Sequence, residues 1–235
     1  MAGQNNHLLQ SIRISLQFIV ILWTIHFLQI STGWDFGRYG VFPREVFGLR
    51  GILLSPLIHS DIQHLFSNSA PLFFLSVMIT YFYRRIALHS MLMIYLLTGL
   101  TVWLFGRRVF HIGASGVVYG LVSFVFWMGI FRRSIKSVIL ALIVTILYSS
   151  YILGILPNQE GISWESHLLG GLTGIFTAYW YKEQMEADEE TPPPPPSWEK
   201  EPSEKQFFLE RDVFEKTKWE RERERKEKLQ DGNIS

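Results

Sequence analysis

The sequence predicts an all-α membrane protein with six transmembrane helices and a charged C-terminal tail. Two observations carry this prediction: an uneven distribution of charge, and six long apolar stretches. The 235 residues contain 22 Lys and Arg and 21 Asp and Glu, but residues 1–182 hold only 12 of the basic and 5 of the acidic side chains. The other 53 residues hold 10 basic and 16 acidic ones. Residues 1–182 therefore carry too little charge to cover a soluble globule of that size, which excludes a single soluble domain.

Each of the six apolar stretches is suited to cross a hydrocarbon core about 30 Å thick, which takes roughly 20 residues of helix. The first follows a short polar start with no clear cleavage site, so we interpret it as a retained span and not as a signal peptide. The second, fourth and sixth contain polar residues and many glycines, which lowers their hydropathy relative to the third and fifth. The stretches cover approximately residues 13–31, 63–83, 87–105, 114–131, 136–156 and 164–181.

Basic residues at the ends of the spans indicate the orientation. One side of the membrane receives Arg13, Arg84, Arg85, Arg132, Arg133, Lys136 and Lys182. The other side receives Arg38, Arg44, Arg50, Arg107 and Arg108. The first set is larger and lies in short connections, where the positive-inside rule is strongest, so we expect both termini in the cytoplasm.

Two segments outside the spans have distinctive compositions. The loop at residues 32–61 mixes aromatic and aliphatic side chains with glycines and arginines, and we expect it to lie partly in the membrane interface. Residues 192–196 are five consecutive prolines that predict a stiff spacer. We therefore divide the chain into a six-helix domain, residues 1–182, and a tail, residues 183–235.

The tail is dense in alternating charge from Glu199 onward, and residues 220–228 predict a solvated helix. We interpret the tail as a cytoplasmic appendage that is disordered or weakly helical. The alternative is a docking module for a cytoplasmic partner or the membrane surface, on an amphipathic face. That face would consist of Phe207, Phe208, Phe214 and Trp219.

Four polar residues share one depth in the predicted bundle. Ser115 opens the fourth span and His167 opens the sixth, while His64 and Asn68 begin the second. Spans two crossings apart start at the same face, so all four lie toward the non-cytoplasmic side. His64 and Asn68 are four residues apart and stack on one helix face. Polar side chains inside a span are costly unless they are paired, so this layer is a candidate site.

The residue types in this layer suggest acyl transfer. Ser115 lies between small residues at a helix start, with Gly113 and Gly116 allowing close approach of another main chain or a substrate. His167 could take the serine proton and return it to a leaving amine. The Ser115 N–H and the side chains of His64 and Asn68 could bind the oxyanion. The plainer alternative is a packing serine and a histidine that caps a carbonyl.

An acidic third member is not evident near this predicted pair. Asp61 and Glu165 are nearby in sequence, but Glu165 precedes His167 by only two residues and so points elsewhere on a helix. We therefore predict a Ser–His dyad. His59 is expected to form a local hydrogen bond, and no partner is expected for the other histidines. These are His7, His26, His89 and His111.

Three blocks of this sequence resemble the rhomboid intramembrane serine proteases. They are residues 59–68, 113–119 and 166–174, on the second, fourth and sixth spans. The resemblance covers roughly residues 10–182. It implies a bacterial-type six-helix rhomboid bundle. In the first loop the family typically carries a Trp-Arg pair, whereas this chain has Leu49-Arg50. That departure concerns the anchoring of the loop and not the chemistry.

The resemblance also implies roles for individual residues. Ser115 would be the nucleophile and His167 the general base, with His64, Asn68 and the Ser115 N–H as oxyanion donors. Tyr119 would be the ring that packs on the catalytic histidine. Gly170 and Gly174, four residues apart, fit the small-residue spacing that lets two helices approach closely. Gly113 and Gly116 belong to the serine motif.

The function implied by the resemblance is a serine endopeptidase that cleaves single-span transmembrane proteins through an acyl-enzyme. It would work in the lipid bilayer of a bacterial cell membrane, without a cofactor, a metal ion or a nucleic acid partner. One alternative is an inactive rhomboid relative that binds clients. Another is a small transporter, which predicts polar residues over the full depth of several spans. A metalloprotease is disfavoured because His-Glu-x-x-His is absent and His59 and His64 are five residues apart.

Overall fold

The computed structural model describes residues 2–156, 163–184 and 215–231. Within these ranges the chain is helical, and its extended pairing is limited to one antiparallel bridge between Val41 and His111. The chain divides into two compact units, Met1–Glu190 and Thr191–Ser235. Each unit is described by itself.

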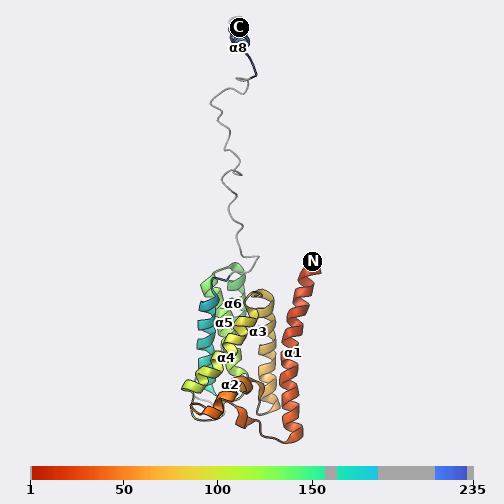
Figure 1. Ribbon diagram of the computed structural model, residues 1–235, viewed down its shortest axis with the longest axis vertical. Coiled ribbons are helices and arrows are strands. Elements are labelled where there is room, and N and C mark those ends of the chain that lie inside the picture. Colours follow the sequence, from red (N-terminus) through yellow and green to blue (C-terminus); the bar gives the residue numbers. More distant parts are fainter. Residues whose placement is uncertain (1, 157–162, 185–214, 232–235) are drawn as a thin grey trace. The chain divides into compact units, whose positions relative to one another are not determined.

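Six long helices form the bundle of the first unit (Figure 1). They are α1 (Ala2–Thr32), α3 (Ile62–Phe82), α4 (Ala87–Phe105), α5 (Ser115–Arg132), α6 (Ile135–Tyr148) and α7 (Trp164–Tyr181). Two boundaries differ from the expected spans. Helix α1 begins at Ala2 instead of near residue 13, because its polar start also forms helix. Helix α6 ends at Tyr148, and a 3₁₀ helix, η4 (Ser149–Ile155), completes the fifth stretch.

Five helical segments in the described residues are long and apolar enough to cross a membrane. They are Asn6–Thr32, Ile62–Phe82, Ala87–Phe105, Ser115–Arg132 and Ile135–Ile155. The sixth helix, α7, has 18 residues and packs against α4 and α5 inside the bundle. Its glycines and polar first turn lower its hydropathy, as the sequence predicts. The predicted all-α membrane bundle is confirmed.

Helices α5 and α7 touch through their main chains. A Cβ atom on Gly170 would lie 2.0 Å from the carbonyl oxygen of Gly116, and one on Gly174 would lie 2.2 Å from that of Gly120. Real Cβ atoms do not approach so closely, so only glycine fits at these two levels. The two helices are consequently held together from the third residue after His167 to the next turn.

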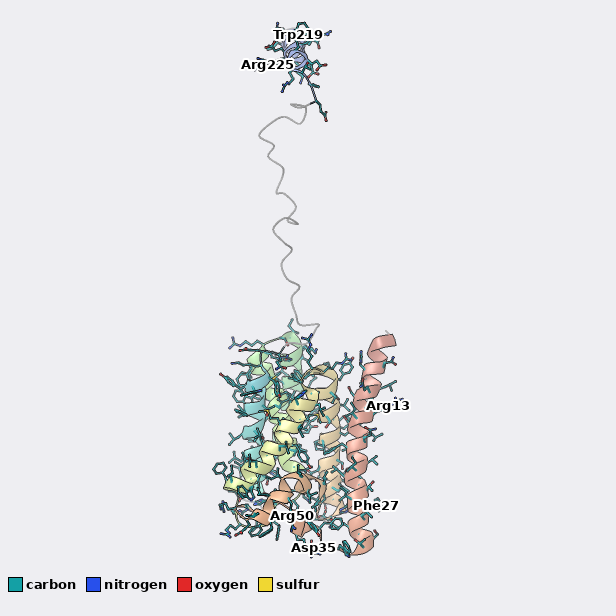
Figure 2. The ribbon with its side chains drawn as sticks, viewed as in Figure 1. Arg13, Phe27, Asp35, Arg50, Trp219 and Arg225 are labelled. Carbon is teal, nitrogen blue, oxygen red and sulfur yellow. The ribbon has the colours of Figure 1, made fainter. Side chains whose placement is uncertain are left out.

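The segment before α3 is folded against α4 and is not a free loop. It forms η1 (Gly37–Tyr39), η2 (Val46–Arg50), α2 (Gly51–Leu54) and η3 (Ser55–Leu57). The Trp103 indole donates to the Glu45 carbonyl at 2.9 Å, and the Arg44 N–H donates to the Trp103 carbonyl at 3.0 Å. Figure 2 shows Arg50 at the end of the bundle away from Arg13. Arg50 covers the Tyr39 ring at 4.7 Å from its centroid.

The second unit contains the helix α8 (Lys218–Asp231) in its described part. The Thr217 N–H donates to a Glu220 carboxylate oxygen at 2.7 Å, and the Glu220 N–H donates to the Thr217 hydroxyl at 3.4 Å. This reciprocal arrangement is a capping box, which explains why the helix starts here. Trp219, the residue of the expected amphipathic face that the structure describes, is 79% exposed. The prolines at 192–196 and the three phenylalanines of the expected amphipathic face lie outside the described residues.

The glycine contact between α5 and α7 predicts a contrast between two adjacent substitutions. Gly170→Ala should lower the free energy of unfolding by about 1–3 kcal/mol, the usual cost of forcing a methyl group into a filled space. The control is Gly171, because a Cβ atom there meets nothing within 4 Å. Gly171→Ala should be neutral or stabilise by up to about 1 kcal/mol through helix propensity. Unfolding of the purified protein in mixed detergent micelles measures both, and equal stability of the two variants would contradict the contact.

Candidate active site

Ser115 and His167 meet at the starts of two neighbouring helices. Ser115 is the first residue of α5, and His167 lies in the first turn of α7. The His167 Nε2 is 2.8 Å from the Ser115 Oγ, and His167 is only 7% exposed. The structure therefore brings together the two residues that the sequence predicts as a dyad.

The second nitrogen of His167 determines what the first can do. The Nδ1 atom lies 2.8 Å from the carbonyl oxygen of Gly154, in η4. A carbonyl only accepts, so Nδ1 carries the proton in this bond. In the neutral imidazole the Nε2 atom then has a lone pair, which faces the Ser115 hydroxyl. This is the tautomer that a general base for a serine requires, and a backbone carbonyl holds it.

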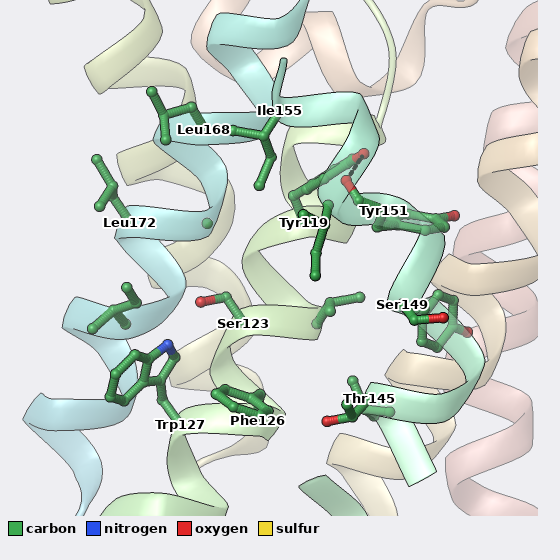
Figure 3. A pocket seen from close by; sticks show the side chains of 16 residues that line it. Tyr119, Ser123, Phe126, Trp127, Thr145, Ser149, Tyr151, Ile155, Leu168 and Leu172 are labelled. Atoms are coloured by element: carbon green, nitrogen blue, oxygen red, sulfur yellow. Dashed lines mark hydrogen bonds between the residues drawn. The ribbon is translucent and has the colours of Figure 1, made fainter. Parts of the chain in front are cut away.

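Tyr119 packs on His167 from the side of α5. Their rings are stacked with centroids 4.1 Å apart and an interplanar angle of 9°. The Tyr119 hydroxyl donates to the Tyr151 carbonyl at 2.8 Å (Figure 3). Because Tyr119 follows Ser115 by four residues on one helix, the same helix presents both the hydroxyl and the ring. Helix η4 thus contacts both members of the stack, through Tyr151 and Gly154.

A cavity of about 390 Å³ lies beside this stack, between α5, α6, η4 and α7 (Figure 3). Its lining is almost entirely apolar and includes Trp127, Ile155, Leu168 and Leu172 along with one face of Tyr119. Gly171 also lines it, which explains the open space around that glycine. The stack of Tyr119 and His167 is therefore bordered by η4, through Tyr151 and Gly154, and by this cavity.

His64 lies against the glycine of the serine motif. A Cβ atom on Gly113 would be 2.7 Å from His64 Nε2, and Gly113 has a φ of +100°. Both the lack of space and the left-handed backbone require glycine at this position. Asp61 caps α3 by accepting the His64 N–H at 2.8 Å. The Ser60 hydroxyl donates to the other Asp61 oxygen at 2.7 Å and lies 3.1 Å from His64 Nδ1. Those bonds from His64 and Ser60 hold the pKa of Asp61 below its ordinary value, so it is a charged acceptor.

The side chains of His64 and Asn68 are engaged within α3 and the turn before it. With its own proton directed to Asp61, the Ser60 hydroxyl accepts from His64 Nδ1, which leaves a lone pair on Nε2 of the neutral ring. The Asn68 amide donates to the His64 carbonyl at 2.9 Å, and Asn68 is 5% exposed. The structure places His64 beside the serine motif, and it bonds Asn68 to the main chain of His64.

Two histidines have partners that the sequence did not predict. His59, expected to bond locally, is fully buried and accepts the Ala114 N–H at 3.4 Å. His111, expected to have no partner, lies 2.9 Å from the Arg107 carbonyl through Nε2 and 2.5 Å from the Ser163 hydroxyl through Nδ1. Both histidines precede a span in the layer of Ser115, and that shared depth was the signal available to find them.

The remaining acidic residue of this layer pairs with an arginine. Glu165 accepts from Arg107, whose Nη2 lies 3.1 Å from Glu165 Oε2, so both oxygens of its carboxylate are engaged by this arginine. In the part of the chain that the structure describes, no three His, Asp or Glu side chains are grouped closely enough to hold a metal ion. Among the described residues, this layer therefore combines the Ser115–His167 pair, the buried His59 and His111, the Asp61 cap beside His64, and the Arg107–Glu165 ion pair.

Comparison with known proteins identifies relatives of this chain. Residues 47–184 match the Rhomboid domain family. Uncharacterized proteins of Mycobacterium bovis and Mycobacterium tuberculosis are each 30% identical over 173 residues, which are 70% of this chain and 72% of theirs. An uncharacterized protein of Mycobacterium leprae is 28% identical over 70% of this chain and 68% of its own. More than half of this integral membrane protein lies within the family match, and the chain belongs to the rhomboid family.

Proposed function

We propose that this protein is an intramembrane serine endopeptidase that cleaves single-span transmembrane proteins through an acyl-enzyme. Rhomboid proteins are generally serine proteases that act on transmembrane substrates within the bilayer. The observation that carries the proposal is the 2.8 Å contact between Ser115 Oγ and the unprotonated nitrogen of His167. An inactive client-binding relative has no use for that tautomer, and it is the weaker alternative.

The reaction begins with proton transfer from the Ser115 hydroxyl to His167 Nε2 as Ser115 Oγ attacks the scissile carbonyl carbon. The imidazolium then gives the proton to the leaving amine, and the peptide bond breaks to leave an acyl-enzyme. Water then attacks the acyl carbon as it gives a proton to His167 Nε2. The imidazolium returns that proton to Ser115 Oγ as the ester bond breaks and the acid product leaves. The Gly154 carbonyl accepts a hydrogen bond from the imidazolium throughout, and the Tyr119 face stabilises the positive ring by a cation–π contact.

Negative charge develops on the carbonyl oxygen during the attack. The start of α5 offers the Ser115 N–H and the positive end of an 18-residue helix. His64 and Asn68 complete the oxyanion site in this proposal. His64 donates from Nε2 when the Ser60 hydroxyl turns from Asp61 to His64 Nδ1, and Asn68 donates its second amide hydrogen.

We further propose that the protein lies in a bacterial cell membrane with both termini in the cytoplasm. The basic residues of the short connections support this orientation. The dyad then opens toward the non-cytoplasmic side. Residues 1–182 form the protease domain, and residues 183–235 form a linker and charged tail that is not needed for the chemistry.

Loss of either dyad member should abolish catalysis without unfolding the protein. Ser115→Ala and His167→Ala should each lower cleavage of a single-span substrate by roughly 10⁴-fold or more, and the double variant should be no worse, because the two act as a unit. Labelling with a fluorophosphonate probe and a cleavage assay in proteoliposomes measure the effect. Substantial labelling or cleavage by a folded Ser115→Ala protein would refute the assignment.

Removing an oxyanion donor should affect turnover more than binding. Asn68→Ala and His64→Ala should each cost about 2–4 kcal/mol of transition-state stabilisation, seen as a lower kcat with little change in KM. Gln63 is exposed on the same helix, so Gln63→Ala is the control and should behave as wild type. Steady-state kinetics on a fluorogenic substrate separate the two parameters. If both site variants changed only KM, they would be binding or structural residues instead.

Truncation of the tail should leave the protease intact. A chain ending at Glu186 retains every helix that carries Ser115, His167 and His64, so its unfolding temperature and its activity on a generic substrate should equal those of the full chain. Side-by-side assays in one detergent measure both. Lost activity in a folded truncated protein would mean that the tail contacts the catalytic domain.

A further inference from the structure

An ion pair joins the loop before Ser115 to the first turn of α7. Arg107 donates from Nε and Nη2 to the two carboxylate oxygens of Glu165, so the pair is bidentate. The Glu165 side chain is 7% exposed, whereas that of Arg107 is 60% exposed. A carboxylate buried to this extent requires a charged partner, which makes Arg107 the group that keeps Glu165 in place. Glu165 lies two residues before His167.

A second connection joins the same two segments. Burial lowers the pKa of His111 below its ordinary value, so its ring is neutral at pH 7. Its Nε2 donates to the Arg107 carbonyl, which only accepts, and Nδ1 therefore accepts from the Ser163 hydroxyl. Ser163 in turn accepts from the Ser166 hydroxyl at 2.7 Å. This chain of hydrogen bonds runs from the loop to the residue beside His167.

These contacts hold the very start of α7, residues 163–165, just before the glycine contacts begin at Ser166, whose carbonyl oxygen would lie 2.9 Å from a Cβ atom on Gly116. The close contacts of α7 with α5 at Gly170 and Gly174 lie beyond His167 in the chain. Before His167, the first turn of α7 is joined by hydrogen bonds and an ion pair to residues 107 and 111 of the loop that leads into Ser115. The two members of the dyad are therefore tied together on the N-terminal side of both helices.

We propose that Arg107, His111, Ser163 and Glu165 form a loop–helix clamp that positions His167 against Ser115, with Arg107 and Glu165 as its principal positioning residues. This inference rests on the proposed protease function. A neutral amide at position 165 would keep the shape of the side chain but lose the charge that holds Arg107. The first turn of α7 would then be free to shift, and a displacement of about 1 Å between reacting groups costs on the order of 10²-fold in rate.

The chain contains a matched control for this clamp. Arg108, next to Arg107, forms an ion pair with Glu45, which belongs to the segment before α3 and not to α7. The Glu45 side chain is 37% exposed, against 7% for Glu165. Substitutions in this second pair change the same kinds of charge in the same loop without touching the helix of His167.

The test uses two variants of the clamp: the single substitution Glu165→Gln, and a double variant that exchanges the charges, Arg107→Glu together with Glu165→Arg. The two controls are the matching variants of the second pair: Glu45→Gln, and Arg108→Glu together with Glu45→Arg. For each, kcat and KM on a single-span substrate, the rate of fluorophosphonate labelling at Ser115, and the unfolding temperature are measured on the full chain. Glu165→Gln should lose roughly 10- to 100-fold in kcat and in labelling rate with little change in KM. The exchanged pair should recover most of that loss, and both control variants should match wild type.

Each outcome bears on a different claim. Wild-type kcat and labelling in a folded Glu165→Gln protein would overturn the clamp alone, as would an equal loss in the Glu45 and Arg108 controls. A loss that follows the unfolding temperature and that the exchanged pair does not restore would assign the ion pair to stability instead of positioning. Wild-type protein that labels no better than Ser115→Ala would overturn the proposed function itself, and the clamp with it.

Discussion

The main-chain contact between α5 and α7 is the constraint on which the site depends. Hydrocarbon surrounds a membrane bundle on the outside, so helices inside it gain nothing from burying apolar side chains against each other, and close packing has to supply the attraction. Gly170 against Gly116 and Gly174 against Gly120 bring the two backbones into direct contact. At that separation Ser115, next to Gly116, and His167, three residues before Gly170, reach hydrogen-bond distance.

The other contacts of this layer fix the orientation of the two histidines His167 and His64 more than the distance between the helices. The Gly154 carbonyl selects the tautomer of His167, the Tyr119 ring limits its rotation, and Asp61 ends α3 so that His64 faces Gly113. Each of these contacts comes from a different helix end. Helix ends leave N–H and C=O groups without partners, and in this layer they supply much of what a polar site needs.

The sequence could predict the helices and the proximity of Ser115 and His167 because both depend on properties carried by side chains. Apolar length predicts the spans, and counting crossings places Ser115 and His167 in one layer. Gly154 escaped prediction because its contribution is a carbonyl, which every residue has, and because η4 replaces the expected last turns of the fifth span. Arg107 and Glu165 were within reach of the same counting, since Arg107 lies in the loop before the fourth span and Glu165 lies in the first turn of the sixth, both in that layer. Shared depth places His59 in the layer of Ser115, but its particular bond to the Ala114 N–H depends on a turn geometry that spacing does not reveal.

The carbonyl that holds His167 also has an electrical consequence. A carboxylate in its place would bring a permanent negative charge into the bundle, whereas the Ser115–His167–Gly154 chain is neutral at rest. In the proposed reaction an imidazolium and an oxyanion appear together and a few ångströms apart, so the net charge stays zero. A transmembrane voltage acts on a single charge with about 2.3 kcal/mol per 100 mV over the full membrane, but on such a short dipole with only a small fraction of that. In the proposed reaction, the rate of bond cleavage would therefore be nearly independent of the membrane voltage.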